Sequence, residues 1–244
     1  MRTQKTQTGF LFILLFLLSQ LAISCTFAGS FGVKGSGVKK TEAREVSNFT
    51  GLDISGGFEV VLKQGSTQSV VIEADDNLLR DIITEVRGGE LNIYTRNNVW
   101  PHTKMKAYIT FVKLEDIDIS GAVKVFADEN LSFDRLGIEG SGASEINFSA
   151  DVRNLKADFS GASKLILKGN VNTVFIECSG ASKLYLADFN ANEVQLDLSG
   201  ASYAEVSAAE KLIVEASGAS DVKYKGEPKT FTVDTSGASK VRKL

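Results

Sequence analysis

The sequence predicts an all-β domain, a parallel β-helix or β-solenoid with coils of about nineteen residues. Two observations predict this fold: a Ser-Gly-Ala-Ser tetrapeptide recurs at nearly constant spacing, and apolar residues alternate with polar ones on both sides of it. The composition agrees, because 22 glycines and only 2 prolines among 244 residues suit tight corners joined by long ladders of backbone hydrogen bonds.

The repeat is the strongest of these signals. A variant unit, Ser-Gly-Ala-Val, begins at Ser120, and Ser-Gly-Gly-Phe begins at Ser55. The tetrapeptide itself begins at Ser141, Ser160, Ser179, Ser199, Ser217 and Ser236. From Ser120 onward the steps are 21, 19, 19, 20, 18 and 19 residues. A fixed period of this length indicates stacked structural repeats.

Apolar residues take the same places around every unit. Three residues before the first serine lie Ile117, Ile138, Ala157, Ile176, Leu196, Val214 and Val233. Five residues after it lie Val125, Ile146, Leu165, Leu184, Ala204, Val222 and Val241. Strict alternation predicts strands with one buried face. We expect the alanine of each unit at an inward corner, and the glycine before it to supply backbone freedom at the bend.

Two architectures are compatible with this pattern. In an antiparallel meander each unit would be a hairpin turn, but hairpin turns favour Asn-Gly or Asp-Gly and have no need to be identical. In a parallel solenoid each unit stacks on the equivalent unit of the next coil, about 4.8 Å away. Stacking accounts for the recurrence, so the sequence favours the solenoid.

The first half of the chain is less regular. Residues 68–74 and 90–95 are predicted strands, residues 75–83 a turn or short helical piece, and residues 97–104 a polar loop. We interpret residues 37–244 as one β-solenoid domain, irregular to about residue 113 and regular over residues 114–244. The irregular coils are expected to cap one end of the stack.

The N-terminus is typical of a secretory signal. Arg2 and Lys5 precede an unbroken apolar run, Phe10–Leu18, which is too short to span a bilayer. A small residue then precedes Cys25, as in a bacterial lipobox. We therefore predict a signal peptide over residues 1–24, lipid attachment at Cys25 and a tether over residues 25–36. The alternative is ordinary signal cleavage, for example after Ala28.

Charge and cysteine content exclude several classes of protein. The net charge is −3, which offers no electrostatic footprint for nucleic acid. The only two cysteines are Cys25 and Cys178, so a disulfide framework is excluded if Cys25 is lipidated or removed. Cys178 falls on an inward position and is interpreted as a small buried hydrophobe.

The sequence resembles the auto-transporter adhesin head GIN domain family of bacterial exported proteins. The resemblance rests on the cysteine after the apolar run, Gly35-Ser36-Gly37, Phe49 with Ile54, residues 60–65, residues 72–79, Leu91-Asn92-Ile93 and the serial tetrapeptides. It covers nearly the whole mature chain. It implies a right-handed β-helix at the cell envelope and carries over no catalytic residue.

An acid stands two residues before every repeat serine. The set is Asp53, Asp118, Glu139, Asp158, Glu177, Asp197, Glu215 and Asp234. In a parallel stack these side chains form an outward acidic ladder. One interpretation is a row of weak cation sites, since carboxylates are calcium ligands. The other is that corner amides or serine hydroxyls donate to the carboxylates, with screening by Lys124, Lys164, Lys183 and Lys240.

Residues for catalysis are scarce. His102 is the only histidine, and neither zinc-ligand spacing nor a Gly-x-Ser-x-Gly nucleophile elbow is present. No catalytic residue, metal site or cofactor is therefore predicted. Trp100 and Tyr94 are candidates for an aromatic patch that binds a sugar or a partner, against ordinary packing.

The resulting hypothesis is a non-enzymatic cell-envelope protein, adhesin-like or scaffolding. It would be exported and anchored to the outer membrane through Cys25, or otherwise periplasmic or secreted. Its partner would be a surface ligand, protein or glycan, and its membrane contact the lipid anchor alone. The alternatives are a carbohydrate-binding module and, as a third class, a polysaccharide-degrading β-helix enzyme. The sequence does not fix the oligomeric state.

Overall fold

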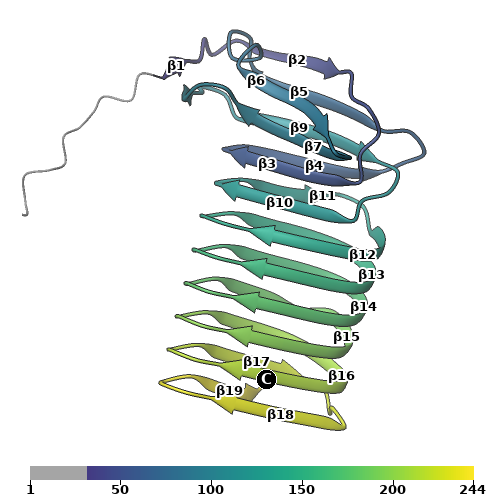
Figure 1. Ribbon diagram of the computed structural model, residues 1–244, viewed down its shortest axis with the longest axis vertical. Helices are drawn as coiled ribbons and strands as arrows, with labels where there is room; N and C mark the ends of the chain where they lie inside the picture. The colour runs from purple at the N-terminus through teal and green to yellow at the C-terminus, as the bar shows by residue number, and fades with distance from the viewer. Residues whose placement is uncertain (1–31) are drawn as a thin grey trace, which may run out of the picture. The chain divides into compact units, whose positions relative to one another are not determined.

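The computed structural model describes residues 32–244, and all regular secondary structure in that range is β. Across these residues there is no helix long and apolar enough to cross a membrane. Residues 1–24 and Cys25, on which the signal and lipid predictions rest, lie outside the described part. The predicted β-solenoid is confirmed, with parallel coils stacked at a spacing of about nineteen residues (Figure 1).

The strands fall into two groups. The irregular N-terminal strands are β1 (Val33–Lys34), β2 (Lys39–Arg44), β3 (Gly51–Gly56), β4 (Phe58–Gln64), β5 (Ser69–Asp75), β6 (Ile82–Arg87), β7 (Glu90–Thr95), β8 (Val99–Trp100) and β9 (Met105–Phe111). The stacked coils comprise β10 (Asp116–Gly121), β11 (Lys124–Ala127), β12 (Leu131–Gly140), β13 (Glu145–Phe159), β14 (Lys164–Cys178), β15 (Lys183–Leu198), β16 (Tyr203–Ala216), β17 (Asp221–Lys225), β18 (Thr230–Thr235) and β19 (Lys240–Lys243).

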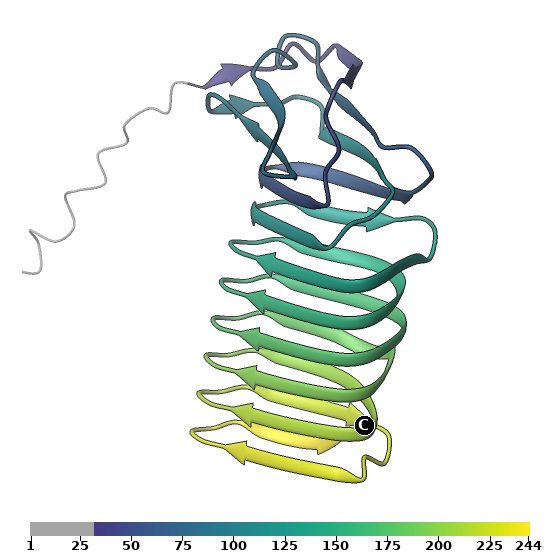
Figure 2. The same cartoon turned by 45° about the vertical axis from the view of Figure 1, so that its right-hand side comes forward.

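Each regular coil runs along one side of the core, bends, and returns along the other side (Figures 1 and 2). In Figure 1 the front strands run to the left and the back strands to the right as the chain descends, which is a right-handed winding. A tetrapeptide forms the corner between the end of one long strand and the start of the next, as between β13 and β14. Coils therefore stack with equivalent residues in register, for example Ile138 on Ala157 and Ala157 on Ile176.

The core is the set of inward ladders that the alternation predicts. Leu165, Leu184 and Ala204 lie one above the other and are fully buried. The same holds for Ile176 and Leu196 on the opposite side of the coil. Burial of such side chains contributes about 1.5–3 kcal/mol each, and the stack must rely on it because the only cysteine in residues 32–244 is a free, buried thiol.

The corner corrects one sequence expectation. The alanine of each unit is exposed, as at Ala162, and the serine after it is buried. The buried serines are Ser144, Ser163, Ser182, Ser202 and Ser220, between 0% and 2% exposed. Four of these hydroxyls donate to the carbonyl oxygen of the serine three residues earlier, as Ser144 Oγ does to Ser141 O at 2.9 Å. In these four coils the hydroxyl closes the corner and is itself hydrogen-bonded.

The corner glycine is required for two reasons. Gly161 has φ +80°, a conformation that costs an L-residue about 1–2 kcal/mol. A Cβ at this position would also lie 2.6 Å from the carbonyl oxygen of Gly142 in the preceding coil. That carbonyl accepts the amide of Ala162 at 2.8 Å, so the coils cannot separate locally without losing a ladder bond.

The N-terminal strands cover one end of the stack, as expected. Strand β9 lies parallel to β4 and antiparallel to β5, which in turn pairs with β2, while β6 and β7 form a hairpin beside β3. The two predicted strands, residues 68–74 and 90–95, are confirmed as β5 and β7. Residues 76–81 form a turn with no helix. Within the predicted polar loop, β8 pairs with β1, so residues 33–34 already belong to the sheet structure.

At the other end, the last coil has nothing packed over it among the described residues. Phe231 and Val233 stack on the buried Leu212 and Val214, yet they are 48% and 37% exposed. The apolar interior is therefore open to solvent at β18 and β19.

Candidate functional site: the bulge in strand β15

The candidate site is a place where the stack departs from its nineteen-residue period. The coil that begins at Ser179 has 20 residues and the next, from Ser199, has 18. Strand β15 therefore carries surplus residues relative to both neighbours. Its pairing with β14 shifts between Ile166 and Gly169, and its pairing with β16 shifts between Leu186 and Asn190. Bulges of this kind are enriched next to binding and active sites.

The surplus residues reshape the outer surface. Ala187 and Asp188 have no partner in β16 and bulge from the face of the strand. Lys225, two coils further on, donates to the carbonyl oxygen of Ala187 and to Asp188 Oδ1, both at 3.1 Å. This lysine bridges the shortened coil and holds the bulge in place.

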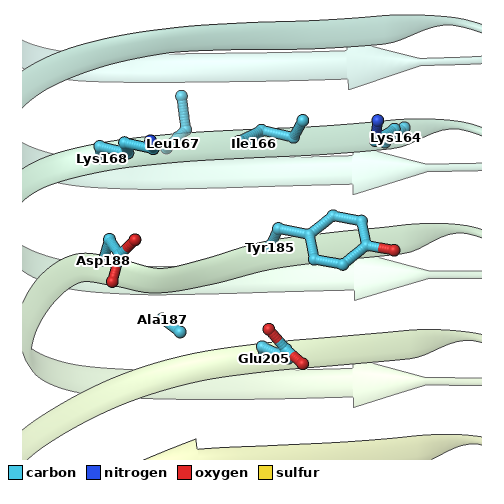
Figure 3. A pocket seen from close by; sticks show the side chains of 8 residues that line it. All are labelled: Lys164, Ile166, Leu167, Lys168, Tyr185, Ala187, Asp188 and Glu205. Carbon is cyan, nitrogen blue, oxygen red and sulfur yellow. The ribbon is translucent and has the colours of Figure 1, made fainter.

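An open cavity of about 390 Å³ lies beside the bulge. It is lined by Lys164, Ile166, Leu167, Lys168, Tyr185, Ala187, Asp188 and Glu205. Figure 3 shows the Tyr185 ring broadside, with Ile166 on the coil above, Glu205 on the coil below and Asp188 further along the same strand. The size falls within the usual range of small-ligand clefts, about 300–1,000 Å³.

Aromatic rings and charges organise the rim. The Tyr185 and Tyr203 rings lie 5.8 Å apart between centroids, tilted by 52°. Lys164 Nζ lies 5.8 Å from the Tyr185 ring centroid, and Lys223 Nζ lies 5.1 Å from that of Tyr203. The Tyr203 hydroxyl donates to Glu205, which raises the pKa of Tyr203, and accepts from Lys223. The rim is thereby preorganised around a half-buried Tyr185.

The acidic ladder exists and is continuous. Each acid from Asp53 to Asp234 stands in register with the next. Partial burial, followed by the charges of Asp53, Glu139 and Glu90, raises the pKa of Asp118. This is the expected effect of like charges stacked at the strand spacing.

The prediction that corner amides or serine hydroxyls donate to the acidic ladder, with lysines close by, is wrong. In residues 32–244 no side chain or amide donates a hydrogen bond to these acids from Asp118 to Asp234. Lys124 and Lys164 pair instead with Glu145, at 4.0 and 3.2 Å. The described residues also hold no group of three metal-ligating side chains placed to bind an ion.

A buried carboxylate organises the N-terminal end. Asp75 is fully buried and accepts amide hydrogen bonds from Gly37, His102 and Thr103 at 2.9, 2.8 and 3.2 Å. Burial by itself would raise the pKa of Asp75, but these donors outweigh it and the pKa lies below its ordinary value. Gly35 leaves the space for this carboxylate, because a Cβ there would lie 2.1 Å from Asp75 Oδ2.

The residues singled out in the sequence take separate places. His102 contributes its backbone amide to Asp75, while its side chain is exposed. Cys178 is 4% exposed, and burial raises the pKa of its thiol to about 12. Trp100 is 57% exposed, and Tyr94 donates to Glu85 at 2.9 Å. No ring contact joins Trp100 to Tyr94 in the described range, so the structure does not form the suggested aromatic patch.

Sequence reasoning missed the site at β15. Tyr185, Asp188 and Glu205 occupy outward positions with no special motif. The available signal is the pair of unequal steps, 20 and then 18 residues, which marks an insertion followed by a deletion. In the sequence, Lys164 stands out only as a screen for the acidic ladder.

The family described as "Putative auto-transporter adhesin, head GIN domain" matches residues 48–228. The chain belongs to this family. Membership in the head GIN domain family indicates an adhesin-like protein that is exported or displayed at the cell surface. No curated protein matches the sequence.

Solved structures share the fold. A putative adhesin from Bacteroides fragilis superposes with a TM-score of 0.82 at 22% identity, over 87% of this chain and 100% of that one. A putative lipid binding protein from Parabacteroides distasonis (TM-score 0.70, 18% identity) covers 87% of this chain and 99% of its own. A putative adhesin from Parabacteroides merdae gives the same values. At these identities the likeness is one of fold.

Proposed function

We propose that this head GIN domain protein is a non-enzymatic adhesin-like component of the bacterial cell envelope that presents its stacked coils as a rigid binding surface. The observation that carries the proposal is the register of the coils. Outward residues form straight rows across successive strands, and backbone ladders fix their spacing. A preorganised surface of this kind lowers the entropic cost of binding.

The uniformity of the rows supports a binding role over a catalytic one. Enzymes that cleave glycosidic bonds use a pair of carboxyl groups with different environments and roles. The acidic ladder repeats one environment from coil to coil. Release of reducing ends or unsaturated products from polysaccharides incubated with the protein would contradict the non-enzymatic assignment.

Surface display and adhesion provide the direct test. The full chain, expressed in a non-adherent bacterial host, should be degraded by proteinase K added to intact cells and should increase adhesion to immobilised mucin or matrix protein. The control is the same host with empty vector. Protection from proteinase K in intact cells, or adhesion no greater than in the control, would refute the proposal.

We also propose that the protein is tethered by a lipid on Cys25. A small residue before this cysteine and the apolar run before it support the tether. Wild-type protein should incorporate radiolabelled palmitate and partition with membranes, whereas Cys25→Ala should do neither. An unlabelled wild type would leave signal cleavage without a lipid as the better account.

A further inference from the structure

We infer that the cavity beside the β15 bulge is a binding site for a neutral glycan; this assignment rests on the proposed adhesin-like function and names its ligand class. The first argument is location. At the bulge, β15 loses register with both of its neighbours, β14 and β16, and the cavity beside it lies between three coils on the outer face.

The charges at the rim argue for a neutral ligand. Lys164 and Lys168 face Asp188 and Glu205, so the lining carries equal numbers of cations and acids. Most of these charges are already matched: Lys164 pairs with Glu145, Asp188 with Lys225, and Glu205 with Lys223 at 3.5 Å. A phosphate or a polyanion would meet the two acids, and a cationic ligand would meet the two lysines.

The shape of the lining suits a sugar ring. A pyranose has an apolar C–H face and a polar rim of hydroxyls. Tyr185, half-buried and broadside to the opening in Figure 3, offers a flat surface for the apolar face, with Ile166 beside it. Aromatic rings are large, rigid contact surfaces that lose little entropy on binding.

Hydrogen-bonding groups surround that surface. The carboxylates of Asp188 and Glu205 can accept from sugar hydroxyls, and charged acceptors make the stronger hydrogen bonds. Lys168 makes no ion pair within residues 32–244 and can donate to a hydroxyl. Because the cavity is open along the face, a polysaccharide can lie across it with its ends in solvent.

Binding measurements on the full chain, purified in mild detergent, test the site. The probes are cellohexaose, laminarihexaose, xylohexaose, mannohexaose and chitohexaose, with oligogalacturonate and heparin hexasaccharides as acidic comparators. At least one neutral probe should bind saturably, and Tyr185→Ala should weaken it by about tenfold or more. Tyr185→Phe should retain binding, because the ring persists.

A matched control comes from the same outward row. Tyr108 is 37% exposed and stands in that row several coils away, so Tyr108→Ala removes an outward aromatic ring without touching the cavity. It should leave glycan binding unchanged, and all variants should melt at the wild-type temperature. Deletion of Ala187, which shortens the bulge, should abolish binding.

Three results would overturn the assignment: no neutral probe binds, only acidic probes bind, or Tyr185→Ala binds as the wild type does. Adhesion assays separate this failure from that of the proposed function. If cells carrying Tyr185→Ala still adhere, the glycan site is wrong while the adhesin-like role stands. If glycans bind but cells never adhere, the adhesin-like role is wrong.

Discussion

The Cβ that Gly161 lacks would lie 2.6 Å from the carbonyl oxygen of Gly142, so the spacing of neighbouring coils depends on the absence of a side chain at the corner. The same relationship recurs at Gly180, whose Cβ would lie 2.5 Å from the carbonyl oxygen of Gly161. These contacts make the corner glycines the most exacting positions of the repeat.

Gly161→Ala should therefore lower the free energy of unfolding by more than about 2 kcal/mol, since a positive φ and a backbone clash combine. Gly57→Ala is the matched control. Gly57 takes the alanine position of the unit at Ser55, and a Cβ added there would meet no atom within 4 Å. This control should change stability by less than about 0.5 kcal/mol. Urea denaturation of both variants makes the comparison, and equal losses would contradict the clash.

The buried serines allow a second comparison. Ser144→Ala removes a hydroxyl that donates to Ser141 O and should cost about 0.5–1.5 kcal/mol. The hydroxyl of Ser182 is buried with no hydrogen-bond partner, so Ser182→Ala should cost less or stabilise the fold. Thermal melts can rank the two, and a larger loss for Ser182→Ala would count against the corner hydrogen bond.

Asp118→Asn should stabilise the protein at neutral pH. Because the pKa of Asp118 is raised in the folded state, that state binds a proton more readily, and ionisation costs stability as pH rises through this pKa. The gain at pH 7 should stay below about 1 kcal/mol, since solvent screens the ladder. It should vanish well below the unfolded pKa of about 3.9. A gain that is independent of pH would exclude the charge mechanism.

Asp75→Asn should act in the opposite direction. The pKa of Asp75 is lowered on folding, so its contribution is present above the unfolded pKa and is lost as pH falls through the folded pKa. Loss of the charged acceptor should cost about 1.5–3 kcal/mol at pH 7, and the difference from wild type should shrink in acid. The exposed neighbour offers the control, and Asp76→Asn should cost less.

Cys178 should be inert in the native protein. With a pKa raised to about 12, its thiol is protonated at pH 8 and shielded by the core. In a Cys25→Ala background, a thiol-reactive dye should label the protein only after unfolding, and Cys178→Ala should abolish the signal. Rapid labelling of the folded protein would show that the coil opens around this residue.

The inward ladders could be predicted because they depend only on the alternation of inward and outward side chains along each strand. Ile138, Ala157 and Ile176 are apolar at one offset from the repeat, and stacking needs no further information. Counting back by twos from Leu165 also reaches Ser163, so the same rule places the fourth residue of the unit inward. The expectation that Ala162 lies inward relied on its apolar side chain. In the structure the alternation continues through the turn, so Ser163 is buried and Ala162 is exposed.

The cavity and the Asp75 contacts could not be predicted in the same way. Asp75 and His102 are 27 residues apart, and their hydrogen bond depends on how the irregular strands fold over the end of the stack. Glu205 is the regular partner of Tyr185 in the next coil, and the register shift that follows places Ala187 and Asp188 beside the same cavity. Contacts of this kind depend on tertiary packing, which the periodic sequence pattern does not predict.

The register of the coils has a consequence for how such proteins change length during evolution. Removal of residues 160–178 would set the unit at Ser179 directly on the unit at Ser141, and Lys183 and Leu184 would then follow Glu145 and Ile146 in the stack. Inward apolar residues would still stack on apolar residues, the buried serine of one corner on that of the next, and each corner glycine on another glycine. A gain or loss of one complete coil would thus preserve the core and the corners. A change of one or two residues would instead shift the register of neighbouring strands, as is seen at Ala187 and Asp188.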